Sequence, residues 1–559
     1  MSKFFCALHL LSDVKSPVRA NVLYIPYDQL NDKIGPLSRW KPEETTIIMF
    51  ETSHKGTRRR YHKQKLAILL SNNRHFALEQ AKRGVQVLYR CGKDDYGTML
   101  STIQQEYTIP EIQVMRPAER ELRKELKPCI EAGWLKPIKH EGWLSTRQDL
   151  ENTSKHAPWK MANFYQKMRK RTGILMENNK PIGGKYSFDG DNRLAWKGDP
   201  EVPAVPVFEL DDITSEVCDF IEFSFPDAVG KLDRTQVPAT KEDAVKLWEW
   251  AKRECMVHFG PYEDAMHTDS KSLFHTRISP LLNLHRLLPK QVVQDIELLD
   301  VPFNSKEGFI RQVLGWREFM YQIHEYTDGL RRIPNKDGTW TEHPTVQIDT
   351  DIPEQDGGTL INVLGYKTPL PDAFWGKKCG LNCLDSVVKD VMDDGFTHHI
   401  PRLMVLANIA TLLEIQPREI TDWFWVSFID AFDWVVEPNV LAMGTFATGE
   451  VLSTKPYIAG AGYINKMSNF CKGCSFHPKK NCPLTRLYWA YLDNHRERFK
   501  NNFRMKMVLR SLDKRSDVKK LTDRAIFTWM VQTLARGEVL SILNMPTEET
   551  VSVLQDELQ

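Results

Sequence analysis

The 559-residue sequence lacks the features of membrane, secreted and disordered proteins. It has no apolar run near the roughly 20 residues that a membrane-spanning helix needs, and no low-complexity tract. The short apolar stretch behind Lys3 contains His9 and no small-residue cleavage site, so we expect no signal peptide. Ten cysteines in so long a chain do not indicate a disulfide scaffold, and we expect a protein of the reducing cytoplasm, without membrane contact.

Two further absences concern function. The formal net charge is only +2, so the composition does not announce a nucleic-acid-binding protein, although a local basic face would be averaged away in that value. No strand-like segment is followed by Gly-x-Gly-x-x-Gly, which argues against a dinucleotide site of the Rossmann type. The chain does have 42% hydrophobic residues and 15 tryptophans, and its length indicates two or three domains.

The first segments predict an α/β domain. Short runs rich in β-branched residues, read as strands, occupy 20–30, 45–52, 85–91 and 112–117. A long helical pattern fills residues 59–84 and ends at Gly84. Strands that alternate with helices predict a parallel sheet with crossover helices. We therefore expect a Rossmann-like α/β domain over residues 20–150.

The character of the chain changes twice after residue 150. Residues 151–235 are rich in turn-forming and charged segments, which is typical of a connector. From 236 to 559 apolar residues recur at three- and four-residue spacing, the pattern of helices. The expected architecture is thus an α/β domain, a connector over 151–235 and a large all-α domain over 236–559.

Three cysteines near the C-terminal end predict a metal site. Cys471 and Cys474 are separated by two residues, and Cys482 follows with Pro483 behind it. Two intervening residues let a tight turn direct both thiolates at one metal. The candidates for a fourth ligand are His477, Cys379 and Cys383. Spacing leaves zinc and an iron–sulfur cluster about equally open, although a cysteine followed by proline recurs in iron–sulfur ligation.

The most specific patterns of the helical region are Gly260–Ser279, Val313–Tyr326, Phe396–Leu412 and Asp422–Gly444. Together, and in this order, they resemble the flavin-binding domain of the photolyase/cryptochrome family. The segment Thr454–Cys474 is closest to the iron–sulfur branch of that family, the prokaryotic (6-4) photolyases and their cryptochrome-like relatives. The resemblance runs from about residue 20 to about residue 510.

The resemblance implies two cofactors in the helical domain. One is a [4Fe–4S] cluster held by Cys383, Cys471, Cys474 and Cys482. The resemblance thus favours iron–sulfur over zinc, and Cys383 over His477 and Cys379 as the fourth ligand. The other is flavin adenine dinucleotide, FAD. Its expected contacts are Tyr262, Thr276, Arg277, Ser279, Gln312, Trp316, Arg402, Asp430, Asp433 and Asn439, where the two aspartates are alternative partners of Arg402.

The resemblance also implies catalytic roles. The expected reaction is light-driven reversal of (6-4) photoproducts, in which oxygen moves between two bases and a proton is needed beside the electron. A histidine can supply that proton, and we assign it to His399 with His398 as its partner. The expected lesion pocket is lined by Tyr457, Tyr463 and Met443, and the electron-donating tryptophans are Trp423 and Trp375.

The expected partner is UV-damaged DNA, bound by a monomer that flips the damaged dinucleotide out of the duplex. The basic stretches Arg58–Lys65 and Lys167–Arg171 are candidates for phosphate contacts. The resemblance further allows an antenna chromophore of the ribityl-lumazine type in the N-terminal domain. There, however, Lys55 and Arg58 stand where relatives have an acidic and an aromatic residue.

Three other functions stay open at this point. A cryptochrome-like photoreceptor would carry the same cofactors without repair, and a cyclobutane-dimer photolyase would need no proton-donating histidine. A nucleic-acid protein that uses its cluster only as a scaffold would bind no flavin.

Overall fold

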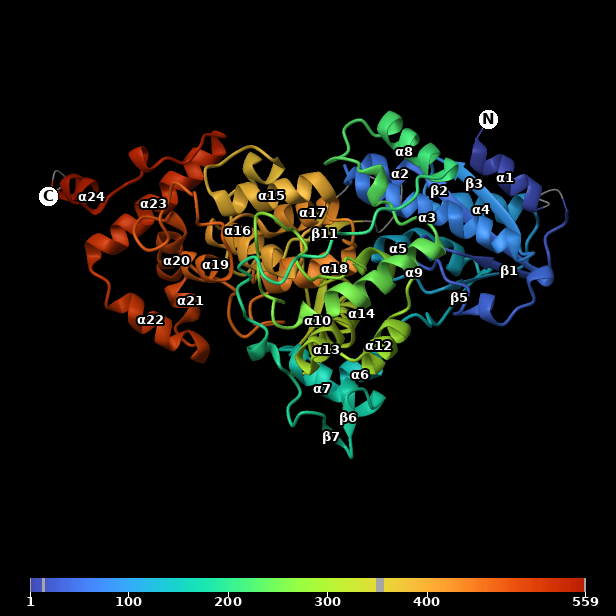
Figure 1. Cartoon of the computed structure of the whole chain (residues 1–559), viewed down its shortest axis with the longest axis horizontal. Coiled ribbons are helices and arrows are strands. Elements are labelled where there is room, and N and C mark those ends of the chain that lie inside the picture. Colours follow the sequence, from blue (N-terminus) through green and yellow to red (C-terminus); the bar gives the residue numbers. More distant parts are fainter. Residues whose placement is uncertain (1, 13–15, 348–355, 557–559) are drawn as a thin grey trace.

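The structure, a computed structural model, describes residues 2–12, 16–347 and 356–556. The α/β region with the N-terminus forms one end of an elongated molecule (Figure 1). Helices that follow it in the chain form the middle, and the last helices extend to the opposite end, where the C-terminus lies.

A five-stranded parallel sheet in the order β3-β2-β1-β4-β5 lies in the N-terminal region, as predicted. Its strands are β1 (Asn21–Tyr24), β2 (Thr45–Thr52), β3 (Gln86–Gly92), β4 (Ile112–Met115) and β5 (Leu135–Ile138). The residues of β2 are buried along almost the whole strand, which explains why its apolar residues Ile47–Phe50 follow each other without alternation. The pattern did not reveal β5, a four-residue edge strand that contains Pro137.

The helices α3 (Lys63–Lys82), α4 (Tyr96–Glu106) and α5 (Arg120–Glu131) connect these strands. The core around the sheet also includes α1 (Lys3–Leu11) and α8 (Asp212–Ser224), which lie outside 20–150 in the sequence. Phe4 of α1 packs edge-on against Tyr89, with ring centroids 4.7 Å apart. The Ser2 hydroxyl donates to Glu216 of α8 at 2.6 Å, so the start of the chain is attached to the connector.

The remainder of the described chain is mostly helical, as predicted. Its longer helices are α6 (Arg147–Thr153), α7 (Met161–Thr172), α9 (Lys241–Trp250), α12 (Pro289–Leu298), α13 (Phe303–Ile310), α14 (Glu318–Tyr326), α15 (Asn382–Asp394), α17 (Pro417–Ser427), α19 (Ala461–Met467), α20 (Pro483–Asn494), α22 (Lys506–Asp513), α23 (Asp517–Ala535) and α24 (Glu548–Asp556). Short antiparallel pairs join β6 (Met176–Glu177) to β7 (Lys180–Pro181), β8 (Arg332–Pro334) to β9 (Trp340–Glu342), and β10 (Thr345–Gln347) to β11 (Asp356–Thr359). No helix among the described residues is both long enough and apolar enough to cross a membrane.

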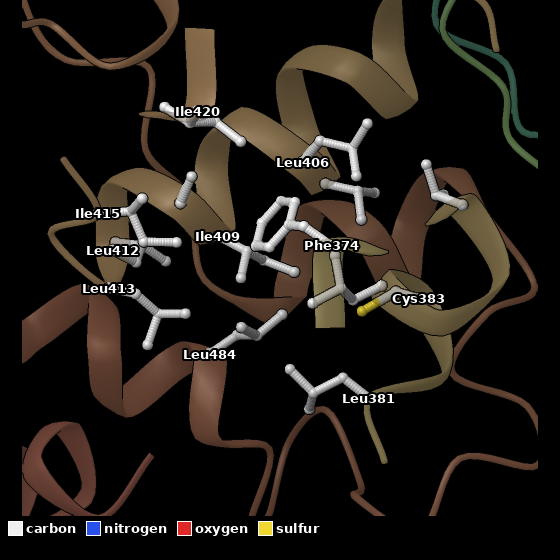
Figure 2. Close-up of a cluster of buried hydrophobic side chains, with 14 of the residues drawn as sticks. Phe374, Leu381, Cys383, Leu406, Ile409, Leu412, Leu413, Ile415, Ile420 and Leu484 are labelled. Atoms are coloured by element: carbon white, nitrogen blue, oxygen red, sulfur yellow. The ribbon is translucent and has the colours of Figure 1, made fainter. Parts of the chain in front are cut away.

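Apolar side chains from α15, α16 (Asn408–Leu412), α17 and α20 form the core of the C-terminal half. Figure 2 shows Phe374, Leu406 and Ile409 at the centre of this cluster, with Leu484 of α20 beside them. The sulfur of Cys383 lies at its edge. This core thus fixes the position of one predicted metal ligand.

Several helices contain π-helical turns, among them η6 (Arg311–Arg317), η8 (Pro401–Ala407) and η9 (Glu437–Gly444). A π-helical turn holds an extra residue and is rare in proteins, and it occurs frequently at functional sites. These three turns contribute side chains to one pocket.

Candidate active site

A pocket of about 250 Å³ lies among the π-helical turns of the helical region. Gln312 and Trp316 reach it from η6, Arg402 from η8 and Asn439 from η9. The other predicted residues that line it are Thr276, Arg277, Ser279, Asp430, His398 and His399. The structure therefore brings together residues that the sequence spreads over more than 160 positions, from 276 to 439.

A two-point ion pair fixes Arg402 on the pocket wall. Its Nη1 and Nη2 atoms lie 2.9 and 3.1 Å from the two carboxylate oxygens of Asp430, and the Ser279 hydroxyl donates to the same carboxylate at 2.6 Å. Burial would raise the pKa of Asp430, but the Arg402 charge and these hydrogen bonds outweigh it and lower that pKa. The guanidinium lies 4.2 Å from the ring centroid of Phe428. Arg402 is thus a rigid, charged wall residue.

Arg277 and Arg317 add two buried cations to the same pocket. Arg277 has a φ of 56°, a left-handed conformation that non-glycine residues rarely adopt and that is often found at functional sites. Their carboxylate neighbours, Asp394 and Glu318, lie 3.6 and 3.3 Å away. Burial nevertheless lowers the pKa of both guanidiniums, that of Arg317 to about 10. Two guanidinium groups on the wall of one pocket, together with Arg402, are suited to a ligand with negatively charged groups.

Asp433, predicted as an alternative partner of Arg402, does not line the pocket. One of its carboxylate oxygens accepts hydrogen bonds from the backbone N–H groups of Arg120 at 2.6 Å and Glu121 at 3.2 Å. These donors open α5, where the helix leaves its first N–H groups unsatisfied. The prediction for Asp433 is therefore wrong, and its role is to cap a helix of the α/β region.

Tyr262 and Met443 also lie outside the pocket wall. The Tyr262 ring packs beside Phe274, and its hydroxyl donates to the carbonyl oxygen of Asp199 at 3.3 Å. Met443 is partly buried against the apolar cluster around α13 and α14. The flavin contact of Tyr262 and the lesion contact of Met443 therefore stay predictions.

His398 is buried and stacks on His275, with ring centroids 4.2 Å apart and planes inclined by 12°. Its Nδ1 atom has no hydrogen-bond partner within the described parts of the chain. Ring nitrogens of these two histidines and of His399 lie within 4.8 Å of one another. Lone pairs of nearly parallel rings do not converge on one point, however, so this trio does not have the geometry of a metal site.

His399 is the more exposed of the predicted histidines, with 39% of its side chain accessible. Burial and the positive charges of Arg311 and Arg402 lower the pKa of this imidazole. Its Nε2 atom lies 4.0 Å from a carboxylate oxygen of Asp264, whose pKa burial raises to about 6. A weakly basic imidazole thus faces a carboxyl group that retains its proton to an unusually high pH. Between about pH 4 and about pH 6 the carboxyl group of Asp264 is therefore protonated, whereas the imidazole of His399, whose pKa is lowered to about 4, is neutral there.

Asp264 also connects Tyr463 to this site, because the tyrosine hydroxyl donates to it at 3.0 Å. Tyr457 is 37% exposed. Burial and the charge of Asp189 raise the pKa of Tyr457, whereas the charge of Arg504 opposes that rise. The sequence analysis did not predict Asp264 as a site residue, although it is an acidic residue within the recognised segment Gly260–Ser279.

The two predicted electron-donating tryptophans lie between the pocket and the surface. Trp423 is buried and donates from Nε1 to the carbonyl oxygen of Phe374 at 2.8 Å. Its ring centroid is 5.9 Å from that of Phe428, the ring beneath Arg402. Trp375 follows Phe374 directly in the chain and is 41% exposed. Aromatic rings thus extend from the wall of the pocket toward solvent.

The four predicted cysteine ligands come from two parts of the chain. Cys383 lies in the first turn of α15, whereas Cys471 and Cys474 lie between α19 and α20, and Cys482 directly precedes α20. Burial, followed by the neighbouring thiols, raises the pKa of Cys383 well above its usual range, and every cysteine is free.

The spacing of these sulfurs is wider than a zinc ion requires. No three cysteine sulfurs in the described chain lie within 4.8 Å of one another. A tetrahedral zinc ion bound at about 2.3 Å would hold its sulfurs about 3.8 Å apart. The arrangement is more open than that of a single bound zinc ion.

A second pocket, of about 700 Å³, lies at the carboxyl ends of the parallel strands. Lys55 donates to the Tyr27 hydroxyl at 2.8 Å and forms an ion pair with Glu119 on its wall. Phe220 and Phe223 of α8 line it from the connector side. Parallel sheets with this topology bind ligands at this edge.

Comparisons with known proteins agree with this architecture. The family described as "Deoxyribodipyrimidine photo-lyase-related protein" matches residues 23–237. An Agrobacterium fabrum protein named "(6-4) photolyase" is 32% identical over 502 residues, which are 86% of this chain and 92% of that protein. Two solved structures share the fold. A Synechocystis cryptochrome has a TM-score of 0.51 at 14% identity, over 77% of this chain and 83% of the other. A class III photolyase from Agrobacterium tumefaciens has a TM-score of 0.50 at 12% identity, over 98% and 99%.

Proposed function

Because this chain belongs to the (6-4) photolyase family, we propose that it is a monomeric DNA photolyase that uses light to reverse (6-4) photoproducts in UV-damaged DNA. The observation that carries the proposal is a partly exposed imidazole, His399, that lies 4.0 Å from the carboxyl group of Asp264 beside a pocket with several arginines. Splitting a cyclobutane dimer moves no oxygen between bases and needs no such pair, and neither does a signalling photoreceptor.

The buried cations and amide side chains of the pocket support FAD as its ligand, in agreement with the cofactor that the family implies. When bound and reduced, FAD supplies an electron after it absorbs blue light. Arg402, fixed by Asp430, would present a positive charge to the ring system. Arg277 and Arg317 offer charge-assisted hydrogen bonds to the pyrophosphate. Gln312 and Asn439 provide amide groups that can contact uncharged polar atoms.

In the proposed reaction His399 donates a proton from Nε2 to the lesion while oxygen moves between the bases. Asp264 lies 4.0 Å away and holds a proton below about pH 6, so in that range it is the nearest acidic group that could resupply the imidazole once His399 has given up its proton. Tyr463, held by Asp264, and the half-exposed Tyr457 present polar rings to the flipped dinucleotide. The role of His398 is to keep the histidine pair oriented by stacking on His275.

Replacement of Trp423 by phenylalanine is expected to abolish most photoreduction of the flavin. Phenylalanine preserves the packing against Phe374 and Phe428 but is much harder to oxidise than tryptophan. The variant should repair normally once its flavin is reduced chemically. Absorbance during illumination measures the first effect, and repair in dithionite measures the second. Photoreduction at the wild-type rate would exclude Trp423 from the electron path, and Trp489→Phe, a tryptophan of α20 to which no electron transfer is assigned, serves as the control.

We also propose that Cys383, Cys471, Cys474 and Cys482 hold a [4Fe–4S] cluster of structural importance. Supporting observations are their convergence from α15 and the α19–α20 segment and the spacing of their sulfurs, which is wide for one zinc ion. The pocket at the sheet edge is a suitable place for an antenna chromophore, since its volume of about 700 Å³ falls within the range of small-molecule sites. The ion pair between Lys55 and Glu119 makes its wall polar and distinguishes it from the expected lumazine environment.

The direct test illuminates the reduced protein with oligonucleotides that carry either a (6-4) photoproduct or a cyclobutane dimer. We expect restoration of the (6-4) lesion alone, and chromatography of the digested oligonucleotide measures it. Restoration of the cyclobutane dimer alone would change the assigned substrate. Flavin photoreduction without restoration of either lesion would indicate a photoreceptor.

A further inference from the structure

In both basic stretches predicted to contact phosphate, some of the basic side chains are buried or paired within the protein. Arg169 is fully buried and donates to the carbonyl oxygen of Tyr186 at 3.0 Å. Arg59 forms an ion pair with Glu121 at 2.6 Å, and the buried Lys65 donates to the carbonyl oxygen of Trp425 at 3.0 Å. These three side chains are therefore unavailable to DNA, which corrects the prediction for them.

Free positive charge is concentrated instead in residues 498–520, which we call the basic arm. It contains nine lysines and arginines and two aspartates, in a chain whose net charge is +2. It includes the end of α21 (Arg496–Phe499), η10 (Phe503–Met505), α22 and the start of α23. Ion pairs engage Lys500 and Arg515. In the described chain none engages Arg498, Arg504, Lys506, Arg510 or Lys514.

The orientation of α22 directs these charges to solvent. Leu509 and Leu512 are buried in the C-terminal core, so the opposite face of the helix is exposed. Lys506, Arg510 and Lys514 follow each other at four-residue intervals and are all exposed. The arm is thus an amphipathic element with one cationic face.

Two apolar side chains accompany the cations on the surface. Phe503 is 82% exposed and Met507 is 79% exposed, and the Lys506 ammonium lies 5.5 Å from the Phe503 ring centroid. Aromatic rings among lysines and arginines are typical of nucleic-acid-binding surfaces, where they contact bases or sugars while the cations contact phosphates.

The arm is attached to the segment that carries Tyr457. The Asn502 side chain donates to Glu450 at 2.8 Å and to the carbonyl oxygen of Thr454 at 2.9 Å, three residues before that tyrosine. The charge of Arg504 also acts on the Tyr457 hydroxyl. In Figure 1 the labels α21 and α22 lie below α19 and α20, at the end of the molecule away from the α/β region.

We propose that the basic arm binds the phosphate backbone of the duplex that flanks the lesion on the Tyr457 side. This inference rests on the proposed function. A four-residue step along α22 spans about 6 Å, close to the about 7 Å that two nucleotides of one strand span along the duplex axis. Lys506 and Arg510 can therefore contact phosphates two nucleotides apart on one strand, with Arg504 nearer the lesion.

The test compares a triple variant of the arm, Arg504→Gln/Lys506→Gln/Arg510→Gln, with a control that removes the same charge elsewhere. The control is Arg39→Gln/Lys41→Gln/Arg90→Gln, exposed residues of the α/β region that form ion pairs with Glu141, Glu44 and Glu106. Fluorescence anisotropy measures the affinity for a duplex with one (6-4) photoproduct, and for the undamaged duplex, over a range of KCl concentrations.

The arm variant is expected to reduce the slope of log K against log salt by about 2 to 3, because each phosphate contact contributes about 0.9. Its preference for damaged over undamaged DNA should not change, since phosphate contacts carry no sequence information. Phe503→Ala should weaken binding with little effect on the slope. An unchanged slope in the arm variant, or equal losses in arm and control variants, would overturn the inference.

These results are distinguishable from a failure of the proposed function. If the wild-type protein repairs the lesion and the arm variant binds like wild type, the arm inference fails while the function stands. If wild type neither prefers damaged DNA nor repairs it, the proposed function fails, whatever the salt dependence of the arm variant. Circular dichroism and bound-flavin absorbance verify that each variant is folded.

Discussion

The variant His399→Ala is expected to bind flavin and to be photoreduced like the wild type, yet to repair (6-4) lesions at least about 100-fold more slowly. The imidazole takes no part in the Arg402–Asp430 ion pair or in the aromatic contacts of Trp423, so its loss leaves both intact. It does remove the one predicted proton donor that is partly exposed, at 39%, on the pocket wall. Chromatography of the oligonucleotide after single-turnover illumination measures the repair, and absorbance measures the flavin.

Asp264→Asn provides the matched test of the proton source. Burial raises the pKa of Asp264 to about 6, so its carboxyl group is protonated below that pH and ionised above it. If this proton resupplies His399, wild-type repair should decline as the pH rises through about 6, and the asparagine variant should lack that decline. His343→Ala, on the segment between β9 and β10, should resemble wild type. Full repair by His399→Ala would assign the proton to another group.

The second large effect is expected at the cysteines. The purified protein should contain iron and acid-labile sulfide in equal amounts, and Cys474→Ser should be largely insoluble. A cluster bound by Cys383 and by the cysteines before α20 would connect α15 to the end of the chain, and its binding free energy would be folding free energy. A loss of that kind is comparable to the whole stability of a domain, about 5–15 kcal/mol.

Two controls separate ligands from ordinary buried thiols. Cys379→Ala changes a buried cysteine that lies near Cys383 but is not assigned as a ligand, and it should retain the full iron content. Cys91→Ser changes an exposed cysteine of the α/β region and should have no effect on iron or solubility. Zinc without sulfide in the wild-type protein would overturn the cluster assignment.

The parallel sheet and the helical domain could be predicted because their periodic patterns are long. The buried β2 has a β-branched and apolar run from Thr45 to Phe50, whereas the short edge strand β5 left no distinct pattern. Most of the pocket wall could be predicted from motifs, since Arg402, Gln312 and Ser279 occur in recognisable segments.

Side-chain direction could not be predicted in the same way. Asp430 and Asp433 are three residues apart and chemically identical, yet one faces Arg402 and the other caps α5. That difference depends on how the helical domain packs against a helix more than 300 residues away in the sequence. Likewise, the basic run around Arg59 looked suitable for DNA until tertiary contacts paired it with Glu121.

The π-helical turns make the site sensitive to chain length as well as to residue identity. Each residue of a helix turns the chain by about 100°, so the extra residue in such a turn rotates all that precedes it relative to all that follows. Removal of one residue from η8 would permit a regular helix there, but would rotate His399, which precedes η8, relative to α16, which follows it. A single-codon deletion in this region would therefore disturb the site more than most substitutions, although the shortened segment would form a more regular α-helix.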